Sequence, residues 1–166
     1  GLRTGNSAAI PDDDPSKSII DKRIIGILLS NPDLVRLCKE KSVIEYVKDD
    51  YTKRILKRIF DYFEVGKELV VSSFIETLEQ DSARELVLTA VLDAAEYDEH
   101  ENEKVVSDYF RYLERKFIIV ESQLITRKMA TAEKSGDEKE IMDLLGRKRQ
   151  VLNLMKSHAM EKDEHA

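Results

Sequence analysis

The sequence predicts an all-α protein in which an N-terminal helical bundle of five to six helices is joined by a long helix to a C-terminal helical hairpin. Apolar residues recur three and four positions apart along most of the chain, and no alternating strand pattern is longer than a few residues. The 166 residues include only three prolines and six glycines. Hydrophobic residues make up 42% and charged residues 36%, a balance typical of helices with one apolar and one solvated face.

We expect four segments. Residues 1–17 are small, polar and acidic, which is typical of a linker or a cloning remnant. Residues 18–116 form the bundle, residues 117–157 the hairpin, and residues 158–166 a disordered tail. The chain begins with Gly rather than Met, which suggests a processed or excised fragment.

The first half of the bundle contains three predicted helices and a short apolar piece at 43–47. The first helix follows Ser18 and runs to about residue 29. Asn31 and Pro32 suit the cap and first position of the second, which carries Cys38 on its apolar stripe and ends by about residue 41. Asp49 and Asp50 cap the third, over 51–65, and Gly66 closes it.

The second half of the bundle adds two shorter helices, at about 73–78 and 82–95. Ser73 and Ser82 are each followed three residues later by Glu, as in a capping box. The stretch from 86 to 95 is apolar almost all round, so we expect this helix at the centre of the bundle.

A long helix is predicted to start near Asn102 and to run past Ala132. The acidic run at 96–103 includes His100 and raises the question of a metal site. Acidic residues also favour a helix N-terminus through its dipole, and no second ligand cluster is visible. We therefore expect a solvated helix start and no metal.

The hairpin is predicted because a residue that ends a helix is followed at once by residues that begin another. Gly136 ends one helix, and Asp137 with Glu140 caps the next. So short a turn makes the two helices antiparallel. Two stripes are expected to form the seam, Ile118, Ser122, Ile125, Met129 and Ala132 against Ile141, Leu144/Leu145, Lys148, Val151/Leu152 and Met155. Lys148 falls on that seam, where an apolar residue would be expected. Either its aliphatic stem packs there while its charge reaches solvent, or an acidic residue of a partner pairs with it.

No catalytic motif is present, and we expect neither enzymatic activity nor a cofactor. The sequence lacks phosphate-binding and dinucleotide-binding glycine motifs and the zinc-protease pattern. Its single cysteine, Cys38, suggests a buried thiol in a reducing, cytoplasmic compartment. No apolar run reaches 18 residues, so no membrane partner is expected.

Four motifs resemble the C-terminal helicase-binding domain of bacterial DnaG-type primases. The first is LLSNPDL at 28–34, similar to that family's LLxxNPEL. The other three lie in the hairpin and are ExQLxxR at 121–127, AEKSGD at 132–137 and LLxxKRxxL at 144–152. The resemblance covers about residues 18–157 and implies an all-α bundle followed by a hairpin.

The resemblance implies a non-catalytic, cytoplasmic module of a primase, the DNA-dependent RNA polymerase of replication. Such a module binds the N-terminal domains of the hexameric replicative helicase and couples primer synthesis to unwinding, with the hairpin as the usual main contact. A thin hairpin also leaves apolar surface for a partner. The candidate contact residues are Ile125, Met129, Ile141, Met142, Leu145, Arg149 and Leu152, of which we expect some to be seam.

Three alternatives remain open. The chain resembles the N-terminal domain of the replicative helicase itself. A weak nucleic-acid contact is also compatible with residues 111–156, which hold 11 Lys/Arg and 7 Asp/Glu although the whole chain carries −6. The basic residues would be Arg111, Arg115, Lys116, Arg127, Lys128, Arg147, Lys148 and Arg149. The third alternative is a homodimer through the hairpin.

Overall fold

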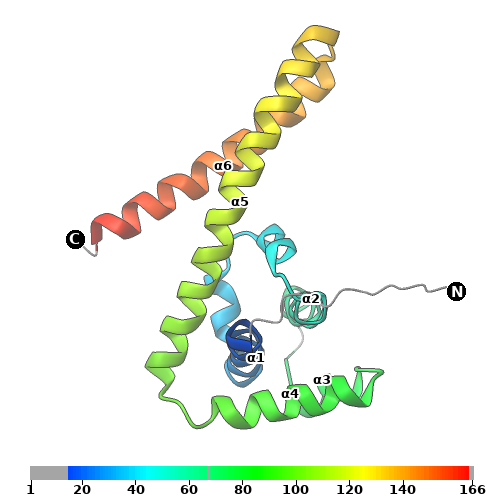
Figure 1. Ribbon diagram of the computed structural model, residues 1–166, viewed down its shortest axis with the longest axis vertical. Coiled ribbons are helices and arrows are strands. Elements are labelled where there is room, and N and C mark those ends of the chain that lie inside the picture. The colour runs from blue at the N-terminus through cyan, green and yellow to red at the C-terminus, as the bar shows by residue number, and fades with distance from the viewer. Residues whose placement is uncertain (1–14, 67, 165–166) are drawn as a thin grey trace, which may run out of the picture. The chain divides into compact units, whose positions relative to one another are not determined.

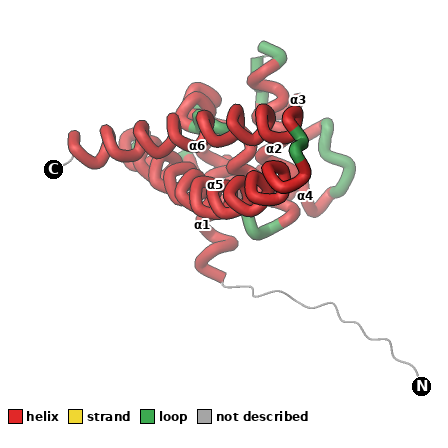
Figure 2. The backbone as a smooth tube through the Cα atoms, turned by 90° about the horizontal axis from the view of Figure 1, so that it is seen from above, coloured by secondary structure: helices red, strands yellow, loops and turns green. Residues whose placement is uncertain are grey.

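The computed structural model describes residues 15–66 and 68–164, with side chains from 19 to 66 and from 68 to 160. Every regular element in these ranges is a helix, as the colours of Figure 2 show. The predicted all-α class and the C-terminal hairpin are therefore confirmed. The chain packs as two compact units, one up to Tyr109 and one from Phe110, so the division lies within the long helix. The sequence predicts the boundary seven residues later, between residues 116 and 117.

The helices follow one another with short connections and can be traced by colour in Figure 1. The first unit contains six helices and the start of a seventh. These are α1 (Pro15–Ser30), two 3₁₀ helices η1 (Pro32–Leu37) and η2 (Lys41–Tyr46), α2 (Asp50–Glu64), α3 (Val71–Glu76), α4 (Asp81–Ala94) and the first turns of α5 (Glu99–Ser135). The second unit contains the rest of α5 and α6 (Glu138–Glu164).

The core of the first unit forms around α1. Ile24, Ile25, Ile27, Leu28 and Leu29 are at most 2% exposed, so this helix is enclosed along its second half. Its main neighbour is α4. The two backbones approach so closely that a Cβ added at Gly26 would lie 2.0 Å from the carbonyl oxygen of Ala90. Glycine at this position is therefore required by the helix crossing.

The expectation that the helix at 82–95 lies at the centre of the bundle is wrong. Only one face of α4 is buried, and the residues on it are Ala83, Val87, Ala90 and Ala94. Leu88 and Leu92 point to solvent. Small residues on the buried face permit the close approach to α1, so the larger apolar residues of α4 lie outside the contact. The absence of a polar face in the sequence did not indicate burial on all sides.

The start and end of α2 agree with the sequence. Thr52 donates its backbone N–H and its hydroxyl to Asp49 Oδ2, at 2.8 and 2.7 Å. Gly66, with φ of +71°, follows the last turn. The buried stripe is Ile55, Leu56, Ile59 and Phe60. Lys41 Nζ lies 2.7 Å from Asp61 and 3.0 Å from Glu64, which ties η2 to the end of α2.

Other helix starts in the first unit differ from the prediction. α1 begins at Pro15, inside the expected linker, and residues 1–14 lie outside the described ranges. Ser73 and Ser82 lie within α3 and α4, whose caps are Val70 and Gln80. A side-chain cap contributes only about 1 kcal/mol, which is less than burying a side chain as large as Phe74. Packing therefore sets these starts.

Cys38 also differs from the prediction. It follows η1 in an extended conformation instead of lying on a helical stripe, and it is half-buried. Its thiol contacts the carbonyl oxygen of Glu40 at 3.2 Å. The short η1 turn ends at Leu37 and thereby places the cysteine in the connection that leads to η2.

A half-buried polar contact links α1 to α5 within the first unit. The hydroxyl of Tyr109 donates to Asp21 Oδ1 at 2.9 Å. Desolvation by burial raises the pKa of Asp21 above its usual value, although the tyrosine hydrogen bond partly opposes this effect.

Candidate partner-binding site on the hairpin

The turn of the hairpin is built as the sequence predicts. Gly136 has φ of +69°, and the N–H of Asp137 donates to the carbonyl oxygen of Ala132 at 3.1 Å. Asp137 then caps α6, because its Oδ1 accepts the N–H of Glu140 at 3.1 Å. One left-handed residue and one capping carboxylate thus reverse the chain.

The seam between α5 and α6 uses one of two neighbouring stripes on α6. Residues 144, 147, 151, 154 and 158 repeat at spacings of three and four, and so do residues 145, 148, 152 and 155. The first stripe is the seam, since its apolar members Leu144, Val151 and Leu154 are buried. Ile125 and Ala132 of α5 are buried as well. The second stripe, about 100° away around the helix, stays at the surface.

Two polar pairs cross the same seam, and the sequence analysis did not find them. Arg147 Nη2 pairs with Glu121 Oε1, and His158 Nε2 lies 2.7 Å from Glu114 Oε2. Both carboxylates are buried. A buried carboxylate without a partner is costly, so these pairs define which residues of the two helices face each other. The available signal was Arg147 and His158 falling in phase with Leu144 and Val151.

Several expectations about α6 are therefore corrected. Lys148 and Met155 are exposed residues of the second stripe and not seam residues, and the charge at that level of the seam belongs to Arg147. The expected disordered tail is wrong for residues 158–164, because α6 continues to Glu164. The His158–Glu114 contact holds this extension against α5. His165 and Ala166 lie outside the described residues.

The candidate contact residues fall into three groups. Met142, Leu145 and Leu152 are 68%, 45% and 45% exposed. Arg149 is exposed too, whereas Met129 and Ile141 are half-buried. Ile125 is only 5% exposed and belongs to the seam.

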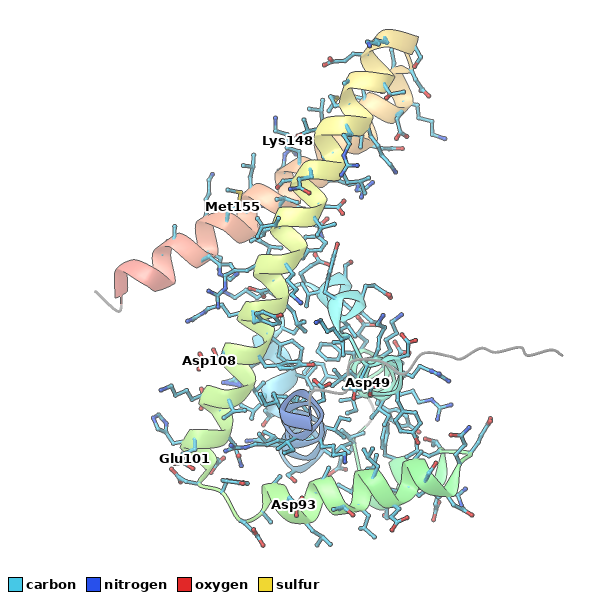
Figure 3. All side chains as sticks on the ribbon, in the orientation of Figure 1. Asp49, Asp93, Glu101, Asp108, Lys148 and Met155 are labelled. Carbon is cyan, nitrogen blue, oxygen red and sulfur yellow. The ribbon has the colours of Figure 1, made fainter. Side chains whose placement is uncertain are left out.

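A shallow groove of about 310 Å³ runs between α5 and the second stripe of α6. We call it the hairpin groove. Its lining residues are Ser122, Ile125, Thr126, Met129, Ala130, Glu133, Lys148, Val151, Leu152 and Met155. Lys148 and Met155, both labelled in Figure 3, lie on the α6 side. Most of the lining is apolar, so the groove suits an apolar ridge better than a polar small molecule.

Comparisons with known proteins add no family to this description. The chain matches no protein-family model, no curated protein and no solved structure. The resemblance to the helicase-binding domain of bacterial primases therefore depends on the four quoted motifs.

The sequence analysis also missed apolar surface outside its candidate set. Ile119, Val120 and Met160 are exposed large hydrophobic residues of the same unit. They are out of phase with the seam on their own helices, which is the signal that could have separated them from core residues.

The basic residues proposed for nucleic-acid contact are spread over both helices. Arg147 is engaged by Glu121, and Lys116 Nζ lies 4.5 Å from the centre of the Tyr112 ring. Arg127 and Lys128 line a second open hollow, near the turn, together with Asp137 and Glu140. Acidic side chains therefore accompany the cations there, which weakens attraction to phosphate.

The described residues provide neither a metal-binding cluster nor a membrane-spanning helix. Among the side chains that the structure describes, no three His, Cys, Asp or Glu residues gather in an arrangement that could bind a metal ion. No helix in the described ranges combines the length and the apolar character needed to cross a bilayer.

Proposed function

We propose that the chain is a non-catalytic interaction module of a DNA primase and that its hairpin binds the N-terminal domains of the hexameric replicative helicase. Through this contact it would couple primer synthesis to unwinding in the cytoplasm. The proposal is supported by the motifs at 121–127, 132–137 and 144–152, all of which lie in the hairpin. The proposed role requires no cofactor and no catalytic group from this module.

The observation that carries the proposal is the second stripe of α6. A two-helix hairpin needs one apolar stripe per helix to form its seam, and the first stripe already supplies it. Leu145, Leu152 and Met155 remain about half exposed. Covering each would contribute about 1 kcal/mol at roughly 25 cal/mol per Å² of apolar surface. Such a stripe stabilises a complex more than it stabilises the free hairpin.

A pull-down with the cognate helicase tests the proposal. Leu145→Asp and Leu152→Asp place a charge in the exposed stripe, where they should preserve the fold. Each should weaken helicase binding by about tenfold or more, since a buried unpaired carboxylate is costly in an interface. Leu88→Asp is the matched control, because Leu88 is 51% exposed on α4 of the other unit, against 45% for Leu152.

A deletion of residues 118–166 gives a second readout. The remaining bundle should stay helical by circular dichroism and should no longer retain the helicase. Undiminished binding would refute the assignment to the hairpin. Loss of binding only in Leu88→Asp would move the contact to the bundle.

A further inference from the structure

The hairpin groove carries two charges of opposite sign on its two sides. Glu133 lies on α5, three residues before Gly136, and Lys148 lies on α6, twelve residues after it. Because both helices run from the same turn, the charges are separated by about nine residues of helical rise, roughly 13 Å along the groove. Neither side chain forms an ion pair or hydrogen bond in the described structure.

The unpartnered Lys148 contrasts with the cation next to it on the same helix. Arg147, one residue earlier on α6, pairs with Glu121. Lys148 instead borders Val151, Leu152 and Met155. A partner that covers these apolar residues also removes water from the ammonium group, and the cost falls when the partner supplies a carboxylate.

We propose that the hairpin groove binds an amphipathic helix of the partner that presents an apolar ridge, a carboxylate toward Lys148 and a cation toward Glu133. This inference rests on the proposed role of the hairpin as a binding arm. The ridge packs against Met129, Leu152 and Met155, whose flexible side chains adapt to its shape. The two charges fix which end of the bound helix lies near the turn.

A second copy of this chain fits the groove less well. A two-fold pairing would place Lys148 beside Glu133 of the other copy, so charge alone does not decide between the two occupants. Shape does, because an isologous pairing sets one hollow against the same hollow and leaves two volumes of about 310 Å³ unfilled. An interface of that kind lacks the packing that stable dimers have. A helix with a protruding ridge fills the groove.

A displayed library of amphipathic helical peptides tests the proposed occupant without knowledge of the natural partner. The peptides carry a fixed apolar ridge, and the flanking positions are varied among Glu, Lys and Gln. Selection on the whole 166-residue chain should enrich Glu at the position facing Lys148. Selection on Lys148→Glu should enrich Lys there, and single peptides should change affinity by about tenfold between the two proteins.

Two variants serve as controls for the selection. Lys139→Glu changes an exposed lysine of the same helix outside the groove and should leave the preference for Glu unchanged. Leu152→Asp should abolish enrichment, because it removes the apolar contact. Enrichment that is absent, insensitive to Lys148→Glu or unaffected by Leu152→Asp would overturn the proposal. Self-association of the wild type that Leu152→Asp abolishes would overturn it in favour of a second copy.

The helicase pull-down separates failure of the groove from failure of the proposed function. If the peptide selection gives the expected result but the chain does not bind the helicase, the proposed use of the groove stands and the proposed helicase partner is rejected. If helicase binding is instead lost on deletion of 118–166 but unaffected by Lys148→Glu and Leu152→Asp, the result supports the proposed function and rejects the groove as the binding site.

Discussion

The bundle and the hairpin use glycine and apolar residues in opposite ways. In the bundle, Gly26 brings α1 against the backbone of α4, and the apolar residues on either side of it are buried. In the hairpin, Gly146 on α6 has no neighbouring atom within 4 Å of the place where a Cβ would stand. A helix enclosed by several neighbours can bury most of its apolar residues, whereas a helix with one neighbour buries a single stripe.

The two units also differ in how they partner the carboxylates that are withdrawn from solvent. In the first unit the half-buried Asp21 has a neutral partner, the Tyr109 hydroxyl. The second buries two carboxylates opposite cationic or titratable partners, Glu121 with Arg147 and Glu114 with His158. A seam of two thin stripes permits sliding by a turn, and charged pairs penalise the wrong registers. The hairpin therefore gains alignment from groups that contribute little net stability.

The largest effect is expected from Gly26→Ala. The added Cβ would lie 2.0 Å from the Ala90 carbonyl oxygen, a backbone atom that cannot move without displacing α4. Overpacking of this kind should destabilise the bundle by about 3 kcal/mol. Urea unfolding followed by circular dichroism measures it, and a loss below about 0.5 kcal/mol would show that the crossing is looser than described.

The next effect separates the two stripes of α6. Leu144→Ala removes a side chain that is 1% exposed and should cost about 2–3 kcal/mol. Leu145→Ala, one position along, removes an exposed side chain and should cost less than about 0.5 kcal/mol. Hydrogen exchange of the α6 amides reports both. Equal effects would contradict the assignment of the seam to the first stripe.

The contrast between the units explains how much of the fold the sequence could predict. Gly136, Asp137 and Asp49 act through bonds to residues at most five positions away, so their roles were predictable from local sequence. The position of α4 was not, because its burial depends on a crossing with α1 some 60 residues earlier. Small residues spaced for close contact were present, but they do not specify which helix they meet.

The candidate site was predictable only as a region. Leu144 and Leu145 head two stripes that are equally apolar and equally spaced, and each stripe contains one cation. Which stripe faces α5 follows from Glu121 of that helix, whose carboxylate accepts a hydrogen bond from Arg147. A long-range ion pair thus decides which apolar residues remain available to a partner.

Breaking that ion pair sharpens the comparison further. Arg147→Ala leaves the Glu121 carboxylate buried without its cation and should destabilise the hairpin by about 1–2 kcal/mol. Replacing both residues, as in Glu121→Leu with Arg147→Leu, should recover most of the loss. Urea unfolding and hydrogen exchange of the α6 amides measure the stability of the single and the double variant. A double variant no more stable than Arg147→Ala would mean that the pair contributes more than register.

The bundle should respond to pH through Asp21. Folding raises the pKa of this carboxyl, so its ionisation disfavours the folded state as pH rises from below 4 to neutrality. Asp21→Asn keeps an acceptor for the Tyr109 hydroxyl and removes the charge. In urea unfolding, the free energy of unfolding of the variant minus that of the wild type should therefore be larger at pH 7 than at pH 3. A difference that is the same at both pH values would contradict burial as the cause.

The smallest effect has the opposite sign to the first. Gly146→Ala adds a methyl group to an exposed position within α6, where it meets no other atom. Alanine lowers the conformational entropy of the unfolded chain and favours the helix, so the hairpin should gain about 0.5–1 kcal/mol. Slower hydrogen exchange of the α6 amides measures this gain. Since Gly26 and Gly146 both lie in helices, opposite outcomes for the same substitution would show directly that α1 has a backbone for a neighbour where α6 has only water.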